Sequence, residues 1–97
     1  MNLQYHEIAR EEILAIVQHY AAIRTELAAD FLTELATGID AVLADPALFE
    51  QVRPGIHRYL LKRFPYGVYY RLPDANTVRI IVVRHHSRHP NLGMRRK

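Results

Sequence analysis

The sequence contains no cysteine and no tryptophan, and its four glycines are scattered rather than gathered in one loop. Without cysteine, disulfide scaffolds, thiol nucleophiles and cysteine zinc sites are excluded. No apolar run approaches the roughly 18 residues of a membrane span, and the first ten residues lack the apolar core of a secretory signal. We therefore expect one cytoplasmic domain over residues 1–97, with no glycine-rich phosphate loop, no membrane partner and neither a metal nor an organic cofactor.

Acidic and basic side chains are segregated along the chain. Residues 1–50 carry nine acidic and two basic side chains, a net charge of −7. Residues 51–97 carry eleven basic side chains and one acidic one, a net charge of +10. A strongly basic half attracts polyanions or acidic proteins through its electrostatic field. The alternative is a solvated basic face that has no partner.

The first half has the periodicity of helices. Apolar residues recur at three- and four-residue spacing from Ile13 to Ile23 and again from Leu27 to Val42, which predicts two amphipathic helices. Only a few residues near Arg24 separate them, so they should form an antiparallel hairpin. Glu11 and Glu12 lie near the predicted helix start, where interaction with the helix dipole explains them more simply than catalysis does.

The second half has the pattern of a sheet. Strands are predicted over Ile56–Phe64, Val68–Leu72 and Val78–Val83, and the turn formers of Leu72–Asn76 predict a hairpin loop. The third of these strands is apolar on nearly both faces. A short strand at Leu3–Tyr5 is expected beside it. The predicted fold is α+β, in the order β-α-α-β-β-β, with a helical hairpin packed on one face of a small antiparallel sheet.

Aromatic and basic residues alternate along part of this sheet. Five of the nine aromatic residues lie between positions 59 and 70, among Arg58, Lys62, Arg63 and Arg71. Rings stack on bases and cations hold phosphates, so this strip has the chemistry of a nucleic-acid surface. The alternative places the rings in the core of the sheet and the cations at its exposed edges.

A second cluster follows the last predicted strand, where the segment from Arg84 to His89 holds three histidines. His85 or His86 could act as acid or base in ribonucleotide cleavage while Arg84 held the phosphate. A zinc site would need more ligands than this cluster offers. The alternative is a solvated C-terminus, and from about residue 87 onward we expect a mobile basic tail.

Four segments carry a resemblance to a known family: Lys62–Arg71, Val78–His86, Phe31–Leu35 and Val52–Arg58. Together they span nearly the whole chain, and in this order they resemble the toxins of the RelE/ParE superfamily. The string Phe-Pro-Tyr-Gly-Val-Tyr-Tyr is typical of the ParE-like branch. The resemblance implies a growth-arresting toxin of a bacterial type II toxin–antitoxin system, a class associated with plasmid stabilization.

The resemblance implies one of two targets. ParE-like members are known as inhibitors of DNA gyrase, whereas RelE-like members cut mRNA on the ribosome. RelE-like nucleases commonly place an arginine at the start of the third strand, where this sequence has Tyr66, so we expect a gyrase inhibitor. The alternative is a ribosome-dependent endonuclease that uses Arg84, His85 and His86 with Lys62. A third possibility is a chain that has lost toxicity and only binds its antitoxin or an operator.

The resemblance also implies a protein partner. Family antitoxins usually wrap the toxin with an acidic, amphipathic segment that folds on binding, so a hetero-oligomeric complex is expected. Basic side chains bordering a groove would attract such a segment. The residues expected to bind the target or the antitoxin are Arg58, Lys62, Arg63, Tyr66, Arg71, Arg84 and Arg88.

Overall fold

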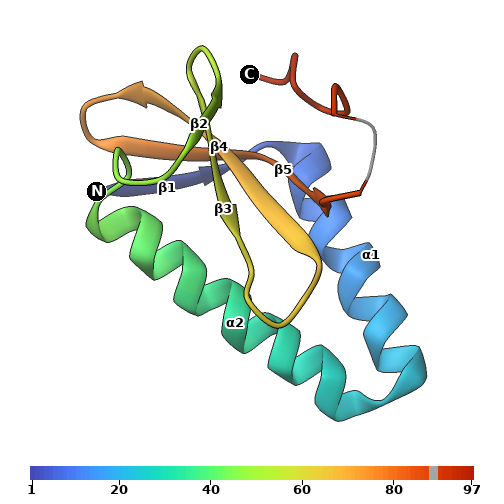
Figure 1. Ribbon diagram of the computed structural model, residues 1–97. Coiled ribbons are helices and arrows are strands. Elements are labelled where there is room, and N and C mark those ends of the chain that lie inside the picture. Colours follow the sequence, from blue (N-terminus) through green and yellow to red (C-terminus); the bar gives the residue numbers. More distant parts are fainter. Residues whose placement is uncertain (88–89) are drawn as a thin grey trace.

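The computed structural model describes residues 1–87 and 90–97 (Figure 1). Its elements, in chain order, are β1 (Asn2–Tyr5), α1 (Glu7–Ile23), α2 (Thr25–Ala44), β2 (Gln51–Arg53), β3 (Ile56–Leu60), β4 (Tyr66–Asp74) and β5 (Thr77–His85). The α+β class and the order of elements predicted from the sequence are confirmed, and the short strand β2 is an addition to them.

The five strands form one mixed sheet in the order β1-β5-β4-β3-β2. β1 runs parallel to β5, whereas the other neighbours are antiparallel. The strand boundaries differ from the prediction: β3 ends at Leu60 instead of Phe64, whereas β4 and β5 extend beyond both of their predicted ends, β4 as far as Asp74. The predicted five-residue loop is therefore a two-residue turn, which the Asp74 carboxylate closes by accepting a hydrogen bond from the Asn76 N–H at 2.8 Å.

The two helices form the predicted hairpin on one side of the sheet (Figure 1). α1 begins where Nδ1 of His6 accepts a hydrogen bond from the main-chain N–H of Ile8, which satisfies one of the free donors of the first turn. Arg24, with an extended backbone at φ −165°, is the single residue between the helices. α2 ends at Ala44, before the proline at position 46 that cannot continue a helix.

The main core lies between this hairpin and the sheet. Phe31 of α2 and Tyr70 of β4 are completely buried there. The Phe31 ring packs edge to face against Phe64, with ring centroids 5.6 Å apart. Helix and sheet approach closely at Gly38, where an added Cβ would lie 2.5 Å from Cε2 of Tyr59. This contact explains a glycine in the middle of a helix, where it is otherwise unfavourable.

A smaller core lies on the opposite face of the sheet, which we call the open face because neither α1 nor α2 covers it (Figure 1). It contains Ile56, Tyr69, Ile81 and Val82 together with Met94 from the C-terminal segment. β5 is thus buried on both faces, as its apolar composition predicted. The position of Met94 shows that residues 90–97, which we call the C-terminal segment, lie over the open face (Figure 1).

Candidate functional site

A pocket of about 550 Å³ opens between α1 and the neighbouring ends of β4 and β5. Its wall carries Tyr66, Arg84 and His85 from the sheet, and Glu12 and His19 from α1. The Tyr66 and His85 rings pack edge to face, with centroids 5.6 Å apart. Hydrogen-bond donors, acceptors and imidazole rings therefore converge on one hollow, which is the usual pattern of a binding site. Tyr66, Arg84 and His85 were all among the residues predicted from the sequence.

His85 is the better oriented of the two candidate histidines. Its Nδ1 accepts a hydrogen bond from the Ser87 main-chain N–H at 3.1 Å and lies 2.7 Å from the Ser87 hydroxyl oxygen. Because Nδ1 is an acceptor, the neutral ring carries its proton on Nε2. The His86 ring packs against that of His85, with centroids 5.1 Å apart, while the His86 main-chain N–H donates to the Pro65 carbonyl.

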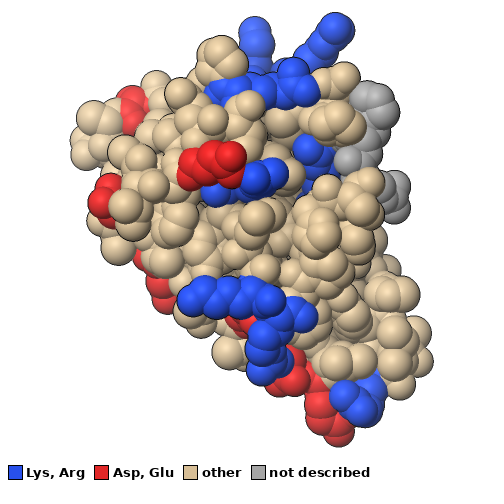
Figure 2. Space-filling view, in the orientation of Figure 1, with Lys and Arg blue, Asp and Glu red and all other residues tan. Residues whose placement is uncertain are grey.

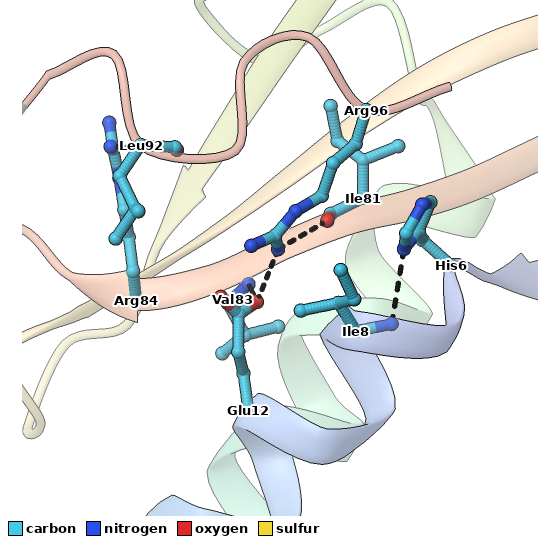
Figure 3. Close-up of polar contacts among 8 residues, drawn as sticks. All are labelled: His6, Ile8, Glu12, Ile81, Val83, Arg84, Leu92 and Arg96. Carbon is cyan, nitrogen blue, oxygen red and sulfur yellow. Dashed lines mark hydrogen bonds and ion pairs between the residues drawn. The ribbon is translucent and has the colours of Figure 1, made fainter.

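Arg84 points to the open face, where it is almost completely buried. Its guanidinium lies over the Tyr69 ring, 4.5 Å from the centroid. Nη1 donates to the Leu92 carbonyl at 2.9 Å, and Nη2 donates to the Pro90 carbonyl at 3.2 Å. The arginine expected to hold a phosphate thus holds the main chain of the C-terminal segment, and Figure 3 shows Arg84 beside Leu92.

Arg58 interacts with the same tyrosine. It is paired with Tyr69 in the β3–β4 register, and its guanidinium forms an ion pair with Glu50. Burial disfavours the charged form of Arg58, but hydrogen bonds to Tyr69 and Glu50 outweigh that effect and raise its pKa above the usual value. Arg58, Tyr69 and Arg84 therefore form a cation–ring–cation row across the open face.

The C-terminal segment covers one end of this row. Nε of Arg71 donates to the Arg96 carbonyl at 2.9 Å and its Nη2 donates to the Met94 carbonyl at 3.1 Å. Arg53 donates to the Pro90 carbonyl at 3.4 Å and contacts the Asn91 side chain. The sequence predicts mobility for this segment. For the segment to move away from the sheet, these contacts would have to break.

Lys62 and Arg63 do not join Arg84. They lie in the loop between β3 and β4 and line a separate depression against α2. Arg63 forms ion pairs with Asp30, at 3.4 Å, and Glu34, at 3.6 Å, and its main-chain N–H donates to the Glu34 carboxylate. Figure 2 likewise shows the basic side chains of one face in separate groups, several of them beside acidic side chains.

Lys62 is therefore separated from the other three residues of the alternative nuclease site. Arg84 and His85 border the pocket at the end of β5, His86 packs beside His85, and Lys62 lines the depression at α2. Arg88, the remaining predicted binding residue, lies outside the described residues.

Glu12 and Arg96 were not predicted to belong to the site. Oε1 of Glu12 accepts a hydrogen bond from the Val83 main-chain N–H at 3.0 Å and also from Nη1 of Arg96 at 2.8 Å (Figure 3). The same Nη1 lies 3.1 Å from the Ile81 carbonyl oxygen, to which it also donates. Interaction with the helix dipole is thus not the main role of Glu12. The signal in the sequence is its place one turn before Ile16, at the border of the buried stripe of α1.

Over residues 1–87 and 90–97, no group of three or more histidine, aspartate and glutamate side chains could hold a metal ion. In the same part of the chain, no helix is both long and apolar enough to span a bilayer.

Comparisons with known proteins give a family match and a structural match. A family model described as the ParE toxin of the type II toxin–antitoxin system, parDE, matches residues 3–90. Among solved structures, the chain is similar to one from the chromosomal ParDE toxin–antitoxin system of P. aeruginosa, with a TM-score of 0.73 and 19% sequence identity. That match covers 88% of this chain and 95% of the other, and at this identity it shows a shared fold. No curated protein matches the sequence significantly.

Proposed function

This chain belongs to the ParE toxins of type II toxin–antitoxin systems, and on that basis we propose that its target is DNA gyrase. The match of residues 3–90 to the ParE family is the observation that carries the proposal, because inhibition of gyrase is what ParE-like toxins are known for. The Tyr66 position supports the same branch. At the start of β4 it presents a ring to the pocket, where a RelE-like nuclease commonly has an arginine.

A binding mechanism also fits the arrangement of the candidate residues better than turnover does. Cleavage of RNA needs a phosphate-holding cation and an acid or base within reach of one scissile bond. Here the cation Arg84 is engaged by Pro90 and Leu92, and Lys62 lies against α2. We therefore propose that the pocket wall of Tyr66 and His85 is a contact surface for gyrase and carries out no chemistry.

The partner of a toxin in this family is an antitoxin, with which it forms a hetero-complex. We propose that the antitoxin contributes an acidic segment. The strands, the β3–β4 loop and the C-terminal segment carry ten of the described basic side chains, whereas the acidic ones are concentrated on α1 and α2. An acidic segment would be attracted to the sheet side of the molecule and repelled by the helical hairpin.

Two assays run side by side test the proposed target. Purified toxin should inhibit DNA supercoiling by gyrase and should leave message intact in a translating extract. His85→Ala, in the pocket wall, should weaken inhibition of supercoiling by about tenfold or more, the cost of one good contact. Lys62→Ala, in the separate depression, is the matched control and should leave inhibition unchanged. Unimpaired gyrase together with cut message, abolished in His85→Ala, would overturn the proposal in favour of a nuclease.

A further inference from the structure

β5 is longer than the strand that pairs with it on its outer side. β1 reaches only to Tyr5, which is opposite Ile80, and the next main-chain bond runs from the His6 N–H to the Ile80 carbonyl at 2.7 Å. β5 continues from there to His85. β4 pairs with this last part of β5 on one side, but within the described residues no strand lies beside it on the β1 side. A strand edge of this kind presents main-chain donors and acceptors that can pair with another chain.

Two side chains take the hydrogen bonds that a neighbouring strand would make. The Glu12 carboxylate accepts from the Val83 N–H, as the carbonyl of a paired strand would. The Arg96 guanidinium donates to the Ile81 carbonyl, as the N–H of a paired strand would. Glu12 and Arg96 also bind each other, so we call them the edge plug (Figure 3). Donor and acceptor thus reproduce a short piece of strand, built from α1 and the C-terminal segment.

The edge plug lies where another chain could displace it. The side chains of Glu12 and Arg96 keep 20% and 15% of their surface exposed, so water reaches both. The register of β4 and β5 shifts beside Tyr69 and Tyr70, which leaves Ile81 as an extra residue at this point. Such bulges interrupt regular pairing and re-aim main-chain groups. The bulge and the plug together keep the edge from pairing while the chain is alone.

The surroundings of the edge select the partner. The pocket of about 550 Å³ runs along it, bordered by Val83, His85 and Glu12, so there is room beside the strand. Among the described residues that line this pocket, Glu12 and Arg84 are the charged ones, and the cation Arg96 binds the Ile81 carbonyl at the edge. An incoming strand that carried an acidic side chain could bind Arg96 in place of Glu12, while its carbonyl accepted the Val83 N–H.

We propose that an extended, acidic segment of the antitoxin adds to the edge of β5 at Val83 and displaces the edge plug. This inference rests on the antitoxin partner given above and is independent of whether gyrase is the target. Main-chain pairing supplies the affinity in strand addition, and side chains at alternate positions supply the specificity. The Glu12–Arg96 pair is then a self-made substitute for the partner, released when the partner arrives.

Amide hydrogen exchange on the full-length toxin, alone and bound to the product of the adjacent antitoxin frame, tests the proposal. In the free toxin, Glu12→Ala should speed exchange of the Val83 amide by about tenfold or more, because its acceptor is lost. In the complex, exchange at Val83 should be slow and equal in wild type and Glu12→Ala. Glu11→Ala, which changes the neighbouring glutamate of α1, is the matched control and should behave as wild type in both states.

Two results would overturn the proposal. If Val83 still exchanges faster in the Glu12→Ala complex than in the wild-type complex, then Glu12 remains its acceptor and no strand has been added. If protection on binding spares Val83 and His85, the antitoxin binds elsewhere. A peptide scan gives an independent signature, since N-methylation of the antitoxin segment should abolish binding at every second residue only. Normal gyrase activity with this protection intact would refute the proposed target and leave the docking site standing.

Discussion

Gly93→Ala is the sharpest probe of how the C-terminal segment is held on the open face. Gly93 has φ +77°, and a Cβ added there would lie 2.4 Å from Cγ2 of Val82 in β5. Gly55, in the turn before β3, has the same φ, but its added Cβ would only reach ordinary contact with Arg71, at 3.4 Å. Gly55→Ala therefore measures the cost of left-handed backbone alone, about 1–2 kcal/mol.

Gly93→Ala should cost more because the clash is with a buried strand that cannot move away. The molecule can relieve it only by releasing the segment, which exposes Met94 and breaks the hydrogen bonds from Arg71. Loss of Met94 burial and of these bonds corresponds to about 2–4 kcal/mol of unfolding free energy. Urea denaturation of both variants measures the difference.

A second substitution separates release from simple strain. Met94→Ala alone should cost about 2 kcal/mol or more, because the side chain is buried against Tyr69 and Val82. In the Gly93→Ala background the same change should cost little, since Met94 is already exposed. Equal losses in Gly93→Ala and Gly55→Ala, with Met94→Ala fully additive, would refute the reasoning.

Three further predictions concern the fold that carries the site. Burial, with a smaller contribution from the charge of Asp45, raises the pKa of Tyr70 to about 12. The folded state therefore favours the neutral phenol. The free energy of unfolding that this preference contributes is fully present below pH 10 and is lost as the pH rises toward 12. Between pH 10 and 11 wild type should lose about 1 kcal/mol more than Tyr70→Phe, and parallel urea-denaturation curves would contradict this. Gly38→Ala should destabilise the protein although alanine has the better helix propensity, because its Cβ would collide with the Tyr59 ring. In a Tyr59→Ala background the same change should be neutral or stabilising by up to about 1 kcal/mol. A loss of unfolding free energy that persists there would show that the close contact is not the cause. Arg63→Ala should cost less than about 1 kcal/mol in thermal unfolding, because the Arg63 side chain is 65% exposed, and a larger loss would mean that its ion pair with the more buried Glu34 is strong.

Local patterns in the sequence were sufficient for the arrangement of the elements. The three- and four-residue spacing from Ile13 onward predicted α1, and the apolar run at Val78–Val83 predicted the buried strand β5. The hairpin loop was misjudged because turn residues such as Pro73 can also end a strand. Pro73 lies beside a shift in the β4–β5 register, where a missing N–H costs no regular ladder bond.

The contacts of the basic residues were beyond the reach of these patterns. Glu12 and Arg96 meet although 84 positions separate them in the sequence. Alternation along β5 does place Arg84 on the same face as Val82, but only the path of the C-terminal segment decides that this face is covered. Charge counts predicted one basic surface, whereas the structure engages Arg84 with the C-terminal segment and Arg63 with α2.

DNA cleavage by purified gyrase tests the proposed function most directly. With plasmid DNA, ATP and the toxin, the enzyme should accumulate covalent complexes that release linear DNA after denaturation and protease treatment. Adding the cognate antitoxin should prevent this accumulation. Undiminished supercoiling and no linear DNA at a large excess of toxin that still arrests growth in cells would contradict gyrase as the target.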